Sequence, residues 1–185
     1  MNTPRLRRAD AVLLIVDVQE RLLPAMRHPE RVERGCVLLA RTFTTLALPV
    51  LATEQNPTRL GSTVNKVAEA LEGNTEFAPV AKMRFSALVP PIVDALTAAQ
   101  RQRVVLCGLE AHVCVLQTAL DLREAGYEVF LARDAVSSRF EDDAQAAFAR
   151  MAAAGVVMGS AEMLVFELLE SADAPEFKPL LPYVK

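Results

Sequence analysis

The sequence predicts an α/β protein built on a central parallel sheet. Short apolar runs alternate along the chain with longer amphipathic stretches, which is the pattern of repeated strand–helix units. Several of the short runs are continuously apolar, as expected for strands in a sheet that helices cover on both faces. Gly126 and Gly155 follow two of the amphipathic stretches, where the end of a helix often requires a left-handed residue.

Each predicted element can be placed on the chain. The expected strands span residues 11–16, 49–53, 80–83, 104–107, 128–132 and 156–158. The expected helices span residues 30–47, 62–72, 90–99, 113–125, 142–154 and 161–171. The tail, residues 174–185, contains three prolines, so we expect an extended segment lying on the body of the protein or on a partner subunit.

The composition indicates one globular domain, residues 1–185, and argues against several kinds of partner. A chain of 185 residues has room for about one domain. The net charge of −3, the absence of long like-charge blocks and the few aromatic residues (8 Phe, 2 Tyr, no Trp) argue against nucleic-acid binding. The first apolar run ends at Asp17, too early for a membrane span or a secretory signal, so we expect no membrane partner and a cytoplasmic protein.

The cysteines and the hydropathy lead to two further expectations. Cys36, Cys107 and Cys114 cannot all pair within one chain, so in a reducing compartment they are expected to be free thiols. Cys36 falls in an amphipathic stretch and Cys107 in an apolar run, and both are expected to be inert core residues. The mean hydropathy of +0.22 is high for a monomer, and we therefore expect a homo-oligomer.

Two charged residues stand where predicted strands end, which is where open parallel sheets place their functional groups. Asp17 directly follows a buried apolar run, so its carboxylate is a candidate to accept and return a proton. The alternative for Asp17 is a helix cap or strand-end turn. Lys82 lies near the end of the third strand, where a cation could stabilise a thiolate or carboxylate; the alternative is a surface lysine with a buried stem.

Cys114 is the third candidate. It follows the fourth strand and a short turn, at the start of a predicted helix. Unpaired backbone N–H groups and the helix dipole are expected to lower the pKa of a thiol there, as a nucleophile requires. The same amides can hold an oxyanion, so one strand–turn–helix unit could supply both the attacking atom and its charge stabilisation. The alternative is a small apolar filler.

The sequence lacks the residues that several cofactors need. His28 and His112 are the only histidines, and neither has a ligand partner at metal-binding spacing, so we expect no metal. Neither the glycine-rich dinucleotide motif nor the phosphate-binding loop motif is present, and we expect no cofactor. His112 lies two residues from Cys114, but neighbours at that spacing usually point in different directions, so a Cys–His dyad is not favoured.

These residues together resemble the isochorismatase-like cysteine hydrolase family, and most closely its short isochorismatase domain-containing members. The specific match is residues 108–122 (GLEAHVCVLQTALDL), in order after Asp17 and Lys82. Further matches are residues 53–57 (TEQNP), 60–61 (LG), 85–86 (FS) and 134–139 (DAVSSR). The resemblance implies a three-layer α/β/α fold around a six-stranded parallel sheet.

The resemblance also implies a triad of Asp17, Lys82 and Cys114. Asp17 would take the thiol proton and later give it to the leaving group, Lys82 would stabilise the charged pair, and Cys114 would attack a carbonyl-type carbon to form a thioester. The oxyanion hole would be made by the backbone amides of Cys114 and Glu110, with a cis peptide between Leu109 and Glu110.

Departures from the family pattern narrow the expected function. Nicotinamidases of the family carry an Asp-x-His metal motif after the second strand, whereas residues 53–55 here are Thr-Glu-Gln. True isochorismatases lack the nucleophilic cysteine that Cys114 provides. The sequence therefore predicts a metal-independent hydrolase of a small amide or ester. Gln55, Phe85 and His112 are candidates to line the substrate pocket, or else pack as scaffold.

Two other functional classes stay open at this stage. The chain could be a binding or assembly domain that keeps the triad without turnover, because a fold does not guarantee activity. It could also be a thiol sensor that uses an activated Cys114. Substitution of Cys114 distinguishes these classes, because only the enzyme loses turnover.

Overall fold

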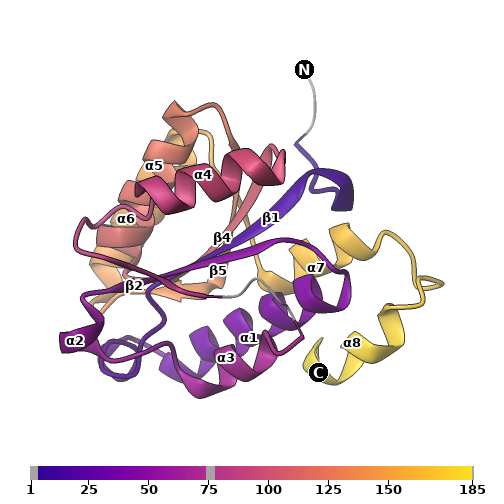
Figure 1. Ribbon diagram of the computed structural model, residues 1–185, viewed down its shortest axis with the longest axis horizontal. Helices are drawn as coiled ribbons and strands as arrows, with labels where there is room; N and C mark the ends of the chain where they lie inside the picture. The colour runs from indigo at the N-terminus through magenta and orange to yellow at the C-terminus, as the bar shows by residue number, and fades with distance from the viewer. Residues whose placement is uncertain (1–3, 74–77, 185) are drawn as a thin grey trace.

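The computed structural model describes residues 4–73 and 78–184, and its framework is a parallel sheet between two layers of helices (Figure 1). The six strands lie in the order β3-β2-β1-β4-β5-β6, and every neighbouring pair is parallel. Their bounds are β1 Ala11–Val16, β2 Val50–Gln55, β3 Val80–Lys82, β4 Arg103–Leu109, β5 Glu128–Ser137 and β6 Val157–Gly159. The predicted three-layer fold is confirmed.

The longer helices divide between the two faces of the sheet (Figure 1). One layer contains α1 Pro29–Thr45, α3 Asn65–Ala70, α7 Ala161–Leu169 and α8 Phe177–Val184. The other contains α4 Pro90–Ala99, α5 Leu116–Glu124 and α6 Glu141–Ala153. The short helices are α2 Pro57–Leu60, two 3-10 turns at Arg8–Asp10 and Leu23–Ala25, and a π-helical turn at Ala111–Val115. In the described part of the chain, no helix is both long enough and apolar enough to cross a membrane.

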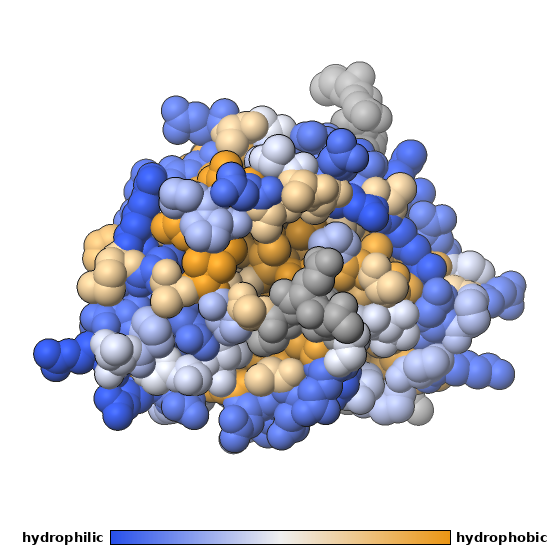
Figure 2. Space-filling view, in the orientation of Figure 1, coloured by the Kyte–Doolittle hydropathy of each residue, from blue (hydrophilic) through white to orange (hydrophobic). Residues whose placement is uncertain are grey.

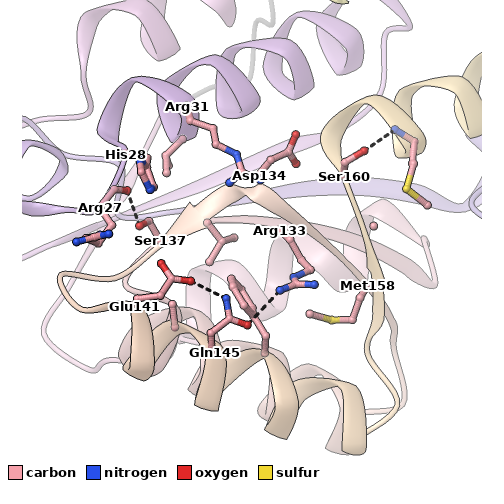
Figure 3. A pocket seen from close by; sticks show the side chains of 16 residues that line it. Arg27, His28, Arg31, Arg133, Asp134, Ser137, Glu141, Gln145, Met158 and Ser160 are labelled. Carbon is pink, nitrogen blue, oxygen red and sulfur yellow. Dashed lines mark hydrogen bonds between the residues drawn. The ribbon is translucent and has the colours of Figure 1, made fainter.

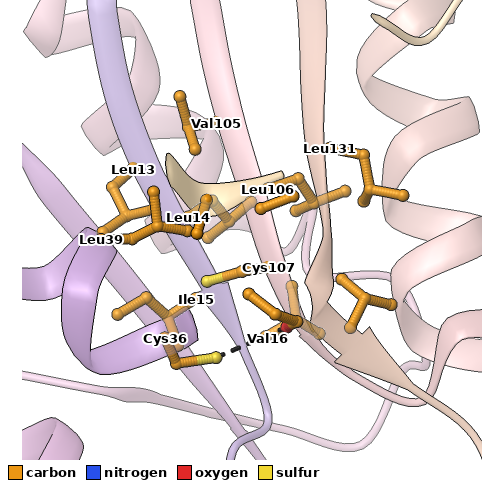
Figure 4. Packing of buried hydrophobic residues seen from close by; sticks show 14 of the residues in the cluster. Leu13, Leu14, Ile15, Val16, Cys36, Leu39, Val105, Leu106, Cys107 and Leu131 are labelled. Atoms are coloured by element: carbon orange, nitrogen blue, oxygen red, sulfur yellow. Dashed lines mark hydrogen bonds between the residues drawn. The ribbon is translucent and has the colours of Figure 1, made fainter. Parts of the chain in front are cut away.

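The centre of the sheet is buried on both faces, which explains why its strands are continuously apolar. All six residues of β1 are buried, and so are six of the seven residues of β4. Figure 4 shows side chains of both strands packed around Cys36 and Cys107, each of which is 0% exposed. The Cys36 thiol donates a hydrogen bond to the carbonyl oxygen of Ala135 at 3.5 Å, so the prediction of two buried core cysteines is confirmed.

The tail is the clearest correction to the predicted elements. Instead of an extended segment, residues Phe177–Val184 form α8, which packs against α1 through the buried Leu180. Apolar residues at 177, 180, 181 and 184 follow helical spacing, and the packing of this face outweighs the two prolines. The segment lies on the body of the protein, which is one of the two locations expected.

Two helical boundaries also differ from the expectation. The segment expected at 62–72 begins at Asn65, because Thr63 pairs with Gln19 in an isolated antiparallel bridge. The segment expected at 113–125 divides into the π-helical turn and α5. Gly126 and Gly155 do adopt the left-handed conformation, with φ of 91° and 81°.

Candidate functional site

The three candidate residues come from the carboxyl edge of the sheet. Asp17 directly follows β1, Lys82 is the last residue of β3, and Cys114 lies in the π-helical turn after β4. Along the chain, β2 and β3 are added on one side of β1, and β4, β5 and β6 are added on its other side. The β1–β4 boundary is therefore the topological switch point, where open α/β sheets place their sites.

Asp17 and Lys82 form a fully buried ion pair. The Lys82 ammonium donates to Asp17 Oδ2 at 2.7 Å, and both side chains are 0% exposed. The hydroxyl of Thr53, on the neighbouring β2, donates to the other carboxylate oxygen at 2.7 Å. The backbone of Asp17 has a φ of 54°, a conformation that Asp tolerates better than most residues.

Besides Asp17, three other oxygen atoms accept hydrogen bonds from Lys82, and together they fix the position of its ammonium group. Its ammonium donates to Gln55 Oε1 at 2.8 Å and to the carbonyl oxygens of Phe85 and Arg84 at 2.9 and 3.2 Å. Burial of an ammonium group is costly unless it is paired and hydrogen-bonded, and this one has a carboxylate and three neutral oxygens. The loop after β3 thus wraps back around its own lysine.

Cys114 lies beside this pair and is a protonated thiol at neutral pH. Burial raises the pKa of the Cys114 thiol to about 12, and the negative charge of Asp17 and a hydrogen bond with it act in the same direction. The positive charge of Lys82 opposes them. The expectation that the helix start lowers this pKa is wrong, because desolvation and a neighbouring carboxylate outweigh the positive charge of Lys82.

The raised pKa defines what the site can do chemically. A protonated thiol cannot attack, but a carboxylate that already interacts with it can remove its proton. Lys82 then lies next to both the carboxyl group of Asp17 and the forming thiolate. The arrangement suits a nucleophile that is activated when it reacts rather than a permanently charged thiolate.

Thr118 connects the lysine loop to the cysteine turn, and sequence reasoning missed it. Its hydroxyl donates to the carbonyl oxygen of Cys114 at 2.6 Å and accepts from the backbone N–H of Ala87 at 2.8 Å. Ala87 closely follows the carbonyls that bind Lys82. Thr53 was missed in the same way, since both look like ordinary β-branched residues in apolar surroundings.

The peptide between Leu109 and Glu110 is cis, as the family resemblance implied. Glu110 then precedes the π-helical turn, and its carboxylate accepts a hydrogen bond from Arg139 Nε at 2.9 Å. This ion pair joins the turn before Cys114 to the segment after β5.

The three candidates for substrate contacts have different positions. Gln55 binds Lys82 and donates from Nε2 to the carbonyl oxygen of Met83 at 3.0 Å. Phe85 is 51% exposed, while its carbonyl binds Lys82. The His112 ring is directed elsewhere, with Nδ1 2.8 Å from the Ser138 hydroxyl. Among the described residues no hydrogen bond joins His112 to Cys114.

Gly108 allows β4 to approach β1 directly beneath Asp17. A Cβ at this position would lie 1.9 Å from the carbonyl oxygen of Val16, and the backbone has a φ of 123°. Gly108→Ala is therefore expected to lower the free energy of unfolding by about 3 kcal/mol or more, measured by urea denaturation.

A matched control variant separates two effects of Gly108→Ala, the clash of the new Cβ with β1 and the strain of a positive φ. Gly126 also has a positive φ of 91°, but a Cβ there would meet nothing within 4 Å. Gly126→Ala is expected to cost only about 1 kcal/mol. Equal losses in the two variants would contradict the role assigned to the β1–β4 contact.

The residues described in the structure contain no group of three or more His, Cys, Asp or Glu side chains that could hold a metal ion. The position of the family's metal motif is occupied by Thr53, Glu54 and Gln55. Thr53 and Gln55 bind the ion pair, and Glu54 accepts from the backbone N–H and hydroxyl of Thr63 at 2.6 and 2.8 Å.

The fold and the site define an α/β protein with a buried Asp–Lys pair beside a cysteine, and comparison with known proteins identifies the family. The isochorismatase domain model matches residues 11–163. A secreted isochorismatase effector, Isc1 of Phytophthora sojae, is 38% identical over 177 residues, which cover 95% of this chain and 84% of the relative. This chain belongs to the isochorismatase domain family.

Solved structures agree with this assignment. A structure described as the MAR1 ribonuclease of Caenorhabditis elegans has a TM-score of 0.91 and 35% identity, covering 98% of this chain and 92% of that one. YcaC of Pseudomonas aeruginosa, solved with covalent acrylamide, has a TM-score of 0.88 and 26% identity over 99% and 93% of the two chains. YcaC of Escherichia coli, described as an octameric hydrolase of unknown specificity, shares the fold with a TM-score of 0.91, 24% identity and coverage of 99% and 92%.

Proposed function

We propose that this protein is a metal-independent cysteine hydrolase that cleaves a small amide or ester through a thioester on Cys114. The observation that carries the proposal is the position of the Cys114 thiol against the buried Asp17–Lys82 pair. A buried ion pair is weak evidence for stability, because apolar residues of similar size often stabilise a core as well. This pair lies beside a nucleophile at the topological switch point, so we assign it a role in proton transfer rather than in stability.

The proposed reaction has two steps. In the first, Asp17 takes the proton of the Cys114 thiol while the sulfur attacks the carbonyl carbon. The C–N or C–O bond then breaks, and the leaving group receives the same proton from Asp17. In the second step a water molecule gives a proton to Asp17 and attacks the thioester; the acid leaves, and the thiol is restored by that proton.

The other groups have supporting roles in the proposal. Lys82 stabilises the negative charge that passes between Asp17 and the sulfur, and Thr53 and Gln55 hold the two members of the pair. The backbone N–H groups of Glu110 and Cys114 bind the oxyanion. Phe85 borders the substrate, whereas His112, which is bound to Ser138, positions the cysteine turn.

A second function is favoured by one observation, the high pKa of Cys114. A thiol with a pKa of about 12 is almost fully protonated in the resting protein, which also suits a domain that binds or assembles without turnover. RNA cleavage, named for the Caenorhabditis elegans structure, is an assay to run beside the amides. With 20 basic against 23 acidic residues, this chain favours a small substrate over RNA.

We also propose a homo-oligomer that acts in the cytoplasm. Apolar residues gather in the middle of the face shown in Figure 2, and the large exposed apolar side chains of the described residues include Met83, Phe85 and Val93. An interface between subunits would cover such residues. The three cysteines are unpaired, as expected in a reducing compartment, although the Phytophthora sojae relative is described as secreted.

The pH dependence of alkylation tests the coupling between Cys114 and Asp17. In the wild type, the rate at Cys114 is expected to rise about tenfold per pH unit through pH 8 to 11, because only the thiolate reacts. Asp17→Asn removes the negative charge and leaves Lys82, so the pKa of Cys114 falls. Alkylation at pH 8 should then become at least about tenfold faster.

Acrylamide is a suitable reagent, with the sites read by peptide mass spectrometry. Cys36 and Cys107, both buried, are internal controls and should stay unmodified in the folded protein. A wild-type midpoint below the free-thiol pKa of about 8.5, or no change in Asp17→Asn, would contradict the proposed coupling.

A further inference from the structure

A separate cavity of about 460 Å³ opens at the carboxyl end of β5 and β6 (Figure 3). Asp17, Lys82 and Cys114 are not among the residues that line it. β6 ends at Gly159, which pairs with Ala132, whereas β5 continues to Ser137. The end of β5 therefore has no neighbouring strand on that side in the described chain, and the cavity lies beside this open edge.

Three arginines line the cavity, two of them with free guanidinium groups. Figure 3 shows Arg27 and Arg31 on the α1 side and Arg133 across from them. Within residues 4–73 and 78–184, the side chains of Arg27 and Arg31 make neither an ion pair nor a hydrogen bond. Arg133 stacks over the Phe148 ring at 4.7 Å and donates to Gln145 Oε1 at 3.3 Å, which leaves it further donors.

The acidic residues of the cavity are bound to other groups. Asp134 accepts from the backbone N–H of Ala161 at 2.7 Å, at the start of α7. Glu141 accepts from Gln145 Nε2 at 2.6 Å. Neither is within ion-pair distance of the arginines, and the three cationic side chains outnumber the two carboxylates, so the lining keeps a formal net charge of +1.

We propose that this cavity binds a small molecule carrying an oxyanion, a phosphate or a carboxylate, through Arg27, Arg31 and Arg133. The planar guanidinium group binds such anions in a bidentate manner, and three of them around one space match a doubly charged group. The volume lies within the range of small-molecule sites, about 300–1,000 Å³. This ligand is distinct from the hydrolase substrate, because it contacts none of the proposed catalytic groups.

The test is calorimetric titration of the full chain with inorganic phosphate and, separately, with malonate at low ionic strength. The double variant Arg31→Gln/Arg133→Gln is expected to bind the anion with at least about tenfold lower affinity. Arg150→Gln/Lys178→Gln is the matched control, because both side chains are exposed outside the cavity and their loss also removes two positive charges. The affinity of this control variant should stay within about twofold of the wild type.

Each outcome decides the proposal. Tighter binding of phosphate indicates a phosphorylated ligand, tighter binding of malonate indicates a carboxylate, and either supports the site. The absence of saturable binding up to about 10 mM of both anions would overturn the proposal, and so would an equal loss of affinity in the control variant Arg150→Gln/Lys178→Gln. Arg27→Gln alone provides a second variant, should the double variant unfold in the thermal melt recorded alongside.

Discussion

Cys114→Ser is expected to reduce kcat/KM for the best amide or ester substrate at least about thousandfold, with little loss of stability. Serine is close in size to cysteine, and Asp17 and Lys82 keep their mutual contact in the variant. The serine hydroxyl is a much weaker acid than the thiol, so Asp17 can no longer generate the attacking anion. The measurement is steady-state kinetics on a panel of small amides and esters.

The control is another cysteine of the same chain. Cys36 is buried in α1 and donates only to the Ala135 carbonyl oxygen, so Cys36→Ala removes a thiol outside the site. The kcat/KM of Cys36→Ala should stay within about threefold of the wild-type value. The variant loses packing contacts around residue 36, but it keeps every group that takes part in the proposed reaction. Turnover that persists in Cys114→Ser, or no turnover of any substrate by the wild type, would favour the binding-domain function.

The sequence could predict the sheet because its information is local. Continuous apolar runs identify strands covered on both faces, and all six strands begin at the predicted residue or within one residue of it. The same runs placed Asp17 and Lys82 at strand ends and Cys114 at the start of the next helix, and the family resemblance then implied that the three act together. What could not be predicted is the chemistry between them, because it depends on groups that are distant in the chain.

The pKa of Cys114 illustrates this limit. The start of a helix is visible in the sequence, and its dipole is expected to favour a thiolate there. The opposing effects are burial and the charge of Asp17, which is far away along the chain and adjacent only after β1 and β4 pair. The same holds for Thr53 and Thr118, whose hydroxyls have a positioning role only once Asp17 and Ala87 lie opposite them.

Gln55 was a candidate either to line the substrate pocket or to pack as scaffold. In the structure its side-chain oxygen binds Lys82 and its amide nitrogen binds the loop after β3. With both polar ends engaged, it orients the lysine. Its place in the chain was predictable, whereas its partners depended on the path of residues 83–87.

Lys82→Met is expected to have the largest effect on stability, about 3–5 kcal/mol in the free energy of unfolding near pH 7. Methionine fills a similar volume but leaves the Asp17 carboxylate buried without a cation, with only the neutral Thr53 hydroxyl at 2.7 Å and the Cys114 thiol as side-chain partners among the described residues. Asp17→Asn should cost less, because Lys82 keeps Gln55 and two carbonyl oxygens as acceptors. Denaturant unfolding of the two variants measures this asymmetry.

The double variant Asp17→Asn/Lys82→Met separates stability from function. Removing both charges leaves no unpaired ion in the core, so the double variant should regain at least half of the stability that Lys82→Met loses. Activity should not return, because neither a base nor a cation remains beside Cys114. If the pair served only to hold the fold, turnover would recover with stability; recovery of stability alone assigns the buried charges to catalysis.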